Sequence, residues 1–197
     1  MKADAGGAGQ GVSLDRTVFD QPSPRLAAAL IGCTLTVEGV GGRIVETEAY
    51  DVEDPASHSF RGPTRRNAAM FGPAGRAYVY RIYGLHWCFN ITCDAGRPGS
   101  AVLIRALEPT LGLEAMMSRR GTPAVHALCA GPGRLCQALT ITGDFTGAPV
   151  WDLPFQLLAP VAQPLTVSGR RVGVSVGVET PWRFVEAGSA WLSRPLR

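Results

Sequence analysis

The chain has 197 residues, is 46% hydrophobic and 18% charged, and carries a formal net charge of +3. This length fits one domain with a sizeable core rather than two independent domains, and 24 glycines with 15 prolines indicate a turn-rich but folded protein. No apolar run approaches the length of a membrane span and the first fifteen residues lack a secretory signal, so we expect an intracellular protein without membrane attachment, in the cytoplasm or nucleoid of a bacterium.

The first part of the chain predicts a helix, two strands and a long loop. Residues 1–13 are rich in glycine and alanine, and we expect a disordered tail there, with one folded domain over 14–197. The patterns that follow predict, in order, a helix over 23–32, a strand over 34–37, a turn over 39–42, a strand over 43–50 and a long connection over 51–76.

The second half begins with a predicted β-hairpin. Its strands cover 77–82 and 87–92, and Tyr83 lies near its tip. Further on, the sequence predicts a strand over 101–107 that Pro109 ends, helices over 113–120 and 133–139, and short strands near 150–158 and 171–178. This order predicts an α+β fold: a single mixed domain with a curved antiparallel sheet, a protruding hairpin and flanking helices.

Arginines cluster in the middle of the chain. Seven lie between Phe60 and Arg105 against a single acidic residue, Asp94, and 18 of the 19 cationic residues are arginine. The arginine side chain binds phosphate through a planar, bidentate fork, so the cluster favours a polyanion such as nucleic acid as the partner. A general arginine bias of the composition would explain the same count.

Five cysteines form no C-x-x-C pair, and we interpret them as reduced thiols of the core. His126, Cys129 and Cys136 have irregular spacing and lack a fourth ligand. The sequence therefore predicts neither a metal site nor a cofactor.

The predicted strand over 43–50 carries a polar face. Alternation places Ile44, Glu46, Glu48 and Tyr50 on one side of the sheet. Glu48 and Tyr50 would stand about 7 Å apart, which sets a potential base beside an aromatic ring. An exposed polar strand face would show the same spacing.

The connection over 51–76 is the first place to look for a site, because loops of this length are usually functional. Its segment Asp54–Ser59 contains Asp, His and Ser, but neighbours in one loop rarely adopt the geometry of a nucleophilic triad. We therefore expect His58 to pack or to form a hydrogen bond. The H-x-E and P-C-x-x-C signature of zinc deaminases is absent from the sequence.

Eight ordered motifs carry a more specific signal. They are Val45–Tyr50 (VETEAY), Glu53–Ser59 (EDPASHS), Arg66-Asn67, Met70-Phe71, Tyr78–Gly84 (YVYRIYG), Asn90, Val102–Pro109 (VLIRALEP) and Gly131–Leu139 (GPGRLCQAL). Together they resemble the alkyladenine (3-methyladenine, methylpurine) DNA glycosylase family, from about residue 15 to the C-terminus.

The resemblance implies a repair enzyme that flips a damaged purine out of duplex DNA and hydrolyses its N-glycosidic bond. By motif position, Glu48 would be the base that activates water for attack at C1′ of the sugar, and Arg105 would help to position that water. The residues that would surround the flipped purine are Tyr50, His58 and Tyr80 around the base and Asn90 at its edge, where it disfavours the amino group of guanine. Tyr83 would enter the gap that the base leaves.

The implied partner is double-stranded DNA containing damaged purines, bound by a monomer. The arginines that we expect to contact its phosphates are Arg65, Arg66, Arg76 and Arg81. Arg65 stands where the family usually has proline, and Leu85 replaces a common methionine beside the wedge. These two departures affect the loop conformation and the base preference that the resemblance implies.

The expected substrates are 3-methyladenine, 7-methylguanine, and hypoxanthine or ethenoadenine. Lys2 is the only lysine, so we expect no Schiff base and no strand cleavage by the enzyme. Two alternatives remain open: a catalytically silent nucleic-acid-binding module with the same fold, and an unrelated hydrolase that uses Glu46 and Glu48 as a carboxylate pair.

Overall fold

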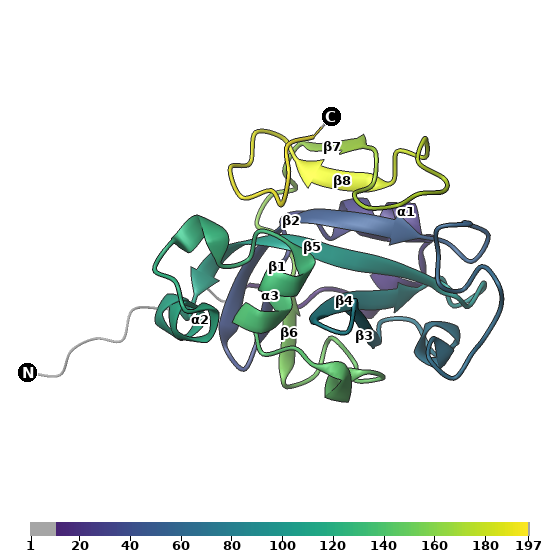
Figure 1. The fold of residues 1–197 in the computed structure, drawn as a ribbon, viewed down its shortest axis with the longest axis horizontal. Helices are drawn as coiled ribbons and strands as arrows, with labels where there is room; N and C mark the ends of the chain where they lie inside the picture. The colour runs from purple at the N-terminus through teal and green to yellow at the C-terminus, as the bar shows by residue number, and fades with distance from the viewer. Residues whose placement is uncertain (1–10, 197) are drawn as a thin grey trace, which may run out of the picture.

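A curled antiparallel sheet forms the body of the protein in the computed structural model, which describes residues 11–196 (Figure 1). Its strands are β1 (Thr34–Val37), β2 (Val40–Tyr50), β3 (Ala77–Ile82), β4 (His86–Cys93), β5 (Ser100–Leu111), β6 (Phe155–Leu158), β7 (Thr166–Gly169) and β8 (Arg183–Glu186). The α-helices are α1 (Ser23–Ala29), α2 (Leu113–Arg120) and α3 (Pro132–Ala138), and the 3-10 helices are η1 (Arg16–Asp20), η2 (Ala68–Phe71), η3 (Val125–Ala127) and η4 (Gly143–Phe145). These elements confirm the predicted α+β fold.

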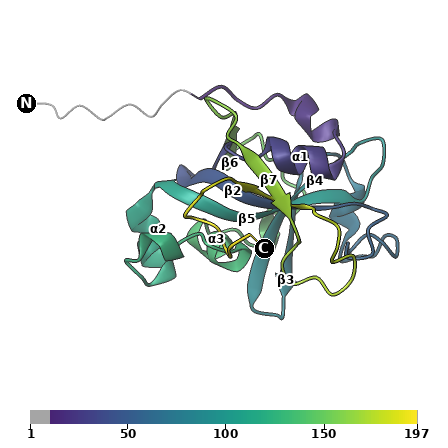
Figure 2. The same ribbon diagram turned by 90° about the horizontal axis from the view of Figure 1, so that it is seen from above.

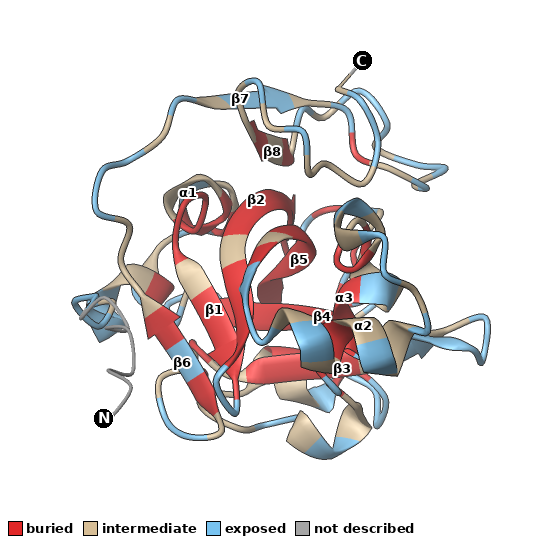
Figure 3. Ribbon diagram, turned by 90° about the vertical axis from the view of Figure 1, so that its left-hand side faces the viewer, coloured by how far each residue is buried: buried red, intermediate tan, exposed pale blue. Residues whose placement is uncertain are grey.

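The strands follow the order β3-β4-β5-β2-β1-β6, and β2 is the strand on which the sheet is organised. One edge of β2 pairs with β5 along its length, while the other edge pairs first with β1 and then, at Glu46–Glu48, with β8. Helix α1 packs on one side of β2 and β5, and α3 packs on the other (Figures 1 and 3).

The apolar core fills the space between the sheet and the helices. Leu26 of α1, Leu30 directly after it, Ile104 and Leu107 of β5, and Phe89 of β4 are fully buried, and the buried strands occupy the centre of the molecule (Figure 3). Burying each of these side chains stabilises the fold by about 1.5–3 kcal/mol. All five cysteines are buried free thiols, as the sequence predicted.

Several predicted elements agree with the structure except at their ends. The helix predicted over 23–32 ends earlier, at Ala29. The strand predicted from Arg43 begins at Val40, because the turn lies at Glu38 and Gly39, both of which have positive φ. Of the strand near 150–158, only Phe155–Leu158 forms.

The prediction that Pro109 ends its strand is wrong. Strand β5 continues to Leu111, with Pro109 opposite Gly42 of β2 at a shift in register. Proline, which has no N–H to donate, is tolerated in a sheet at such irregular positions.

The prediction of a strand over 171–178 is also wrong, because this segment forms turns and bends. The C-terminal strands are β7 and β8 instead, and they pair with each other beside β2. Residues 172–176 are thereby free to line a pocket, as described below.

Two β-bulges make the faces of β2 differ from those that simple alternation predicts. The pairing of β2 with β5 skips Val45 on one strand and Arg105 on the other, so each strand carries one extra residue. A bulge changes which side chains share a face. Ile44 therefore joins Ala49 in the core rather than the face of Glu46 and Glu48, where alternation alone had placed it.

The hairpin of β3 and β4 projects from the body of the protein (Figure 2). At its tip, the Leu85 N–H donates to the Ile82 carbonyl at 3.1 Å, and both Tyr83 and Gly84 adopt positive φ. Positive φ is uncommon for tyrosine but is the conformation that tight hairpin turns favour. The Tyr83 side chain is 86% exposed.

Most of the expected N-terminal tail lies outside the described residues. Of its last part, Ser13 forms a bridge to Leu158 and the Ala159 N–H donates to the Val12 carbonyl at 2.8 Å, so this part lies beside β6. Over residues 11–196 no helix has both the length and the apolar character needed to cross a membrane.

The close approach of β2 and β5 requires glycine at position 42. A Cβ atom there would lie 2.0 Å from the Glu108 carbonyl oxygen and 2.9 Å from the Pro109 Cα. We expect Gly42→Ala to lower the free energy of unfolding by about 1–3 kcal/mol, because the backbone must shift to accept the methyl group. Denaturant unfolding of Gly42→Ala and of the control Gly72→Ala, whose Cβ would meet its nearest backbone atom at 3.4 Å, tests this; equal stabilities would contradict it.

Candidate active site

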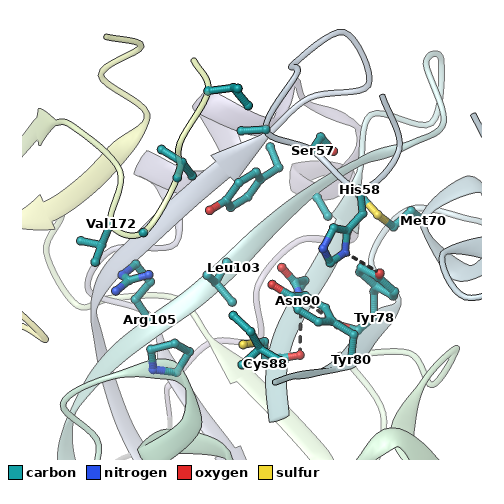
Figure 4. A pocket seen from close by; sticks show the side chains of 18 of the residues that line it. Ser57, His58, Met70, Tyr78, Tyr80, Cys88, Asn90, Leu103, Arg105 and Val172 are labelled. Carbon is teal, nitrogen blue, oxygen red and sulfur yellow. Dashed lines mark hydrogen bonds between the residues drawn. The ribbon is translucent and has the colours of Figure 1, made fainter. Parts of the chain in front are cut away.

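A pocket of about 300 Å³ opens beside the middle of the sheet (Figure 4). Val172 and Arg105 lie on one side of it, and His58, Tyr78 and Tyr80 lie on the other. Its walls therefore come from strands β3 and β5, the loop after β2 and the loop before β8. Long-range pairing of β8 with β2 brings the last of these loops to the site.

Glu48 is a fully buried carboxylate bonded to three residues that line this pocket. Its Oε2 accepts the Tyr50 hydroxyl at 2.8 Å and Nη1 of Arg105 at 3.2 Å, and its Oε1 accepts the Val172 backbone N–H at 2.6 Å. A carboxylate offers about four acceptor positions. Among residues 11–196 no second donor reaches Oε1, so one of its acceptor positions is unfilled.

The face that carries Glu48 is a buried charge network and not an exposed polar surface. Glu46 is also fully buried, and its Oε1 accepts Nε of Arg105 at 2.9 Å and Nε of Arg183 at 2.8 Å. Buried carboxylates are tolerated when they are paired and hydrogen-bonded. Two arginines balance two carboxylates here.

Burial and ion pairing have opposite effects on the pKa of Glu48. Burial raises the pKa of Glu48 above its ordinary 4.5, and the Arg105 charge with the Val172 and Tyr50 hydrogen bonds only partly reverses this. Burial also raises the pKa of Tyr50 well above 10, so its hydroxyl stays protonated and donates. A carboxylate with a raised pKa is a stronger base than a free one.

Aromatic rings form the opposite wall. The His58 and Tyr80 rings meet edge to face with centroids 4.5 Å apart, and Nδ1 of His58 shares a hydrogen bond with the Tyr78 hydroxyl at 2.9 Å. Burial and the nearby Arg66 charge lower the pKa of His58 below 6.5. The ring is therefore neutral at pH 7, and the wall is aromatic and uncharged.

Two asparagines shape the site. Nδ2 of Asn90 donates to the Tyr78 carbonyl at 3.0 Å, which fixes the Asn90 amide at the base of the pocket. Nδ2 of Asn67 donates to the His58 carbonyl at 2.7 Å and to the Gly62 carbonyl at 3.1 Å. Asn67 thus holds the loop that carries His58.

The loop forms no nucleophilic triad, in agreement with the sequence analysis. Asp54 is turned away from His58 and forms a buried two-point pair with Arg171. The Ser57 and Ser59 hydroxyls bond to each other at 2.7 Å.

The predicted phosphate-contacting arginines divide into two groups. Nη2 of Arg66 donates to the Arg81 carbonyl at 2.8 Å, so these two lie together at the hairpin, and Arg65 is exposed in the preceding loop. Arg76 lies elsewhere, with its guanidinium 5.3 Å from the Trp151 ring centroid.

Sequence reasoning missed the contributions of the C-terminal third. They come from Arg171, the Val172 N–H, Arg183 and Ser193, which bond to Asp54, Glu48 or Glu46 across more than a hundred residues. The adjacent arginines at 170 and 171 and the arginine at 183 were the only local signal. Nothing near them in sequence indicates their partners.

Comparison with known proteins gives consistent matches along the chain. The family model described as methylpurine-DNA glycosylase matches residues 17–190. A protein of Nitrosospira multiformis is 55% identical over 91% of this chain and 93% of its own, and one of Rhizobium etli is 53% identical over 100% and 98%. Both carry the name "Putative 3-methyladenine DNA glycosylase". The chain belongs to the methylpurine-DNA glycosylase family.

Proposed function

We propose that this protein is a DNA glycosylase that flips alkylated or deaminated purines out of duplex DNA and hydrolyses their N-glycosidic bonds. The observation that carries the proposal is Glu48, a fully buried carboxylate that is hydrogen-bonded to Tyr50, Arg105 and Val172 of the aromatic pocket and keeps one unfilled acceptor position. Family membership and the names of the relatives support the same reaction class.

In the proposed reaction, Glu48 accepts a proton from water through its open Oε1 position. The water oxygen bonds to C1′ of the sugar as the C1′–N bond breaks, and the electron pair of that bond leaves with the purine. Arg105 holds Oε2 of Glu48 and orients the carboxylate. The negative charge of Glu48 also stabilises the oxocarbenium-like sugar.

The pocket walls suit a purine that is already a good leaving group. Tyr50, His58 and Tyr80 present neutral aromatic surfaces, on which a cationic alkylated base gains about 0.5–2 kcal/mol from cation–π attraction. Such a base needs little protonation to leave. Asn90 would lie against the base edge and disfavour the amino group of guanine. The cation–π attraction favours 3-methyladenine and 7-methylguanine as substrates. Hypoxanthine and ethenoadenine, which are neutral and lack the 2-amino group of guanine, are proposed on the Asn90 contact instead.

Tyr83 is the proposed wedge. Its exposed ring at the tip of the projecting hairpin can stack in the gap that an extruded base leaves, which offsets an unstacking cost of a few kcal/mol. Arg65, Arg66 and Arg81 would bind the phosphates beside it, with the protein acting as a monomer. Arg76, whose guanidinium lies over the Trp151 ring, is proposed as a separate phosphate contact.

Glu48→Gln should lower excision by about 100- to 10,000-fold, because the amide keeps the shape of the side chain but cannot accept the proton. Binding of lesion DNA should stay near that of the wild type. Single-turnover excision from duplexes carrying each lesion, with gel-shift affinity measured in parallel, checks both. A variant that keeps more than about a tenth of the rate would move the base elsewhere, and a wild type that binds but never excises would favour the silent binding module.

Tyr83→Ser should weaken binding and excision on paired lesions more than on bulged ones, because a bulged base leaves less stacking to restore. Tyr83→Phe, which keeps the ring, serves as the control and should behave like the wild type. The measurement is single-turnover excision from matched paired and bulged duplexes. Equal losses on the two substrates would remove Tyr83 from the wedge role.

The enzyme should leave an intact abasic site. Strand-cleaving glycosylases usually form a Schiff base through an amine, and the only lysine of the sequence is Lys2. Borohydride added during turnover should trap no protein–DNA adduct, and the product strand should break only after alkali. A stoichiometric adduct would contradict the water mechanism.

A further inference from the structure

Glu46 is a second buried carboxylate beside the site, and the proposed reaction gives it no step. Besides its bonds to Arg105 and Arg183, Glu46 accepts the Ser193 hydroxyl on Oε1 at 2.8 Å and the Ser193 N–H on Oε2 at 2.6 Å. Arg183 is held in turn by the carbonyls of Arg194 and Pro195. Glu46 therefore ties Arg105 to β8 and to the C-terminal segment.

These contacts fix the plane of the Arg105 guanidinium. Glu46 holds Nε at 2.9 Å, the Ser193 hydroxyl accepts from Nη2 at 3.3 Å, and Nη1 alone reaches Glu48, at 3.2 Å. An arginine free of other partners binds a carboxylate with two nitrogens, one on each oxygen. In that arrangement Arg105 would fill the open position on Oε1 of Glu48.

We propose that Glu46 is a positioning residue that restricts Arg105 to one hydrogen bond with Glu48 and so leaves an acceptor position on Glu48 for the attacking water. This inference rests on the proposed role of Glu48 as the base. It assigns Glu46 to the control of Arg105 rather than to a pair of catalytic carboxylates.

Glu46 also affects the pKa of Glu48. Groups on five elements face Glu48: Glu46 and Tyr50 on β2, Arg105 on β5, Tyr80 on β3, Cys88 on β4, and Arg171 in the loop before β8. Arg183 on β8 pairs with Glu46. Glu46 raises the pKa of Glu48 and Arg105 lowers it, so loss of the Glu46 charge should lower that pKa.

The first test compares Glu46→Gln with Glu108→Gln, which removes a partly buried carboxylate from an ion pair, with Arg43, between the same two strands. Single-turnover excision is measured with saturating enzyme from pH 4 to 9, together with lesion-DNA affinity. Glu46→Gln should lower the plateau rate by about 10- to 100-fold and move the acidic limb to lower pH, with affinity unchanged. Glu108→Gln should keep the wild-type rate and profile.

Two outcomes would overturn the inference while the proposed function stands: Glu46→Gln keeps the wild-type rate, or it loses rate with the acidic limb unmoved. Absence of excision by the wild type would instead overturn the proposed function. If Glu46→Gln does not fold, Ser193→Ala takes its place, because it removes one hydrogen bond to Glu46 and one from Arg105. It should shift the acidic limb in the same direction, because an Arg105 side chain that Ser193 no longer holds can bind both oxygens of Glu48 and lower the pKa of Glu48. An unchanged profile would contradict the inference.

A double-mutant cycle separates positioning from general support of the fold. If Glu46 acts through Arg105, Glu46→Gln should cause no further loss of rate in a variant that already carries Arg105→Met. The same 10- to 100-fold loss in both backgrounds would show that Glu46 acts independently of Arg105 and would overturn the inference.

Discussion

Four charges buried where β2, β5 and β8 meet are the constraint on which the rest of the site depends. Glu46 and Glu48 are fully buried, and Arg105 and Arg183 are nearly so. Removing one partner from such a network costs about 3–5 kcal/mol, because the remaining charge is left uncompensated. All three strands must therefore be in place before the network is satisfied, which couples assembly of the pocket to completion of the sheet.

This arrangement reconciles two demands on the proposed base. Burial strengthens Glu48 as a base but also favours its neutral form, whereas the Arg105 charge favours the carboxylate. Because Arg105 also pairs with Glu46, only part of its attraction acts on the Glu48 carboxylate. The pocket walls add no charge, since His58 is neutral at pH 7. A cationic purine would meet aromatic rings on one side and a balanced ion network on the other.

The sequence predicted the parts of the site that depend on local pattern. The hairpin with Tyr83 at its tip follows from two short aromatic strands around a Tyr-Gly turn, and Glu48 shares a face with Tyr50 because alternation holds beyond Val45. The bulge itself had no signal, because Val45 fits a strand equally well with or without an extra residue. Gly41 and Gly42 resemble a turn, but they are strand residues that allow close approach of neighbouring backbones.

The partners from the C-terminal third could not be predicted. The Val172 N–H meets Glu48 at a sequence separation of 124 residues, and Ser193 meets Glu46 at a separation of 147. Backbone donors and serine hydroxyls have no sequence pattern that would identify such distant acceptors. The resemblance to a family located Glu48 and Arg105, but it gave no role to Glu46.

The paired bulges at Val45 and Arg105 restrict how the chain can change in length. Each strand carries one residue that the ladder skips, and the two skips cancel, so the pairing on either side keeps a common register. Deleting a paired residue such as Thr47 would invert the parity of β2 on one side of the deletion and place Glu46 and Glu48 on opposite faces of the sheet. Deleting both skipped residues would restore a regular ladder, and the resulting sheet could pair without defect yet would lack the arginine between its two carboxylates. Insertions and deletions among relatives that keep this site should therefore fall in the loops and spare these two strands.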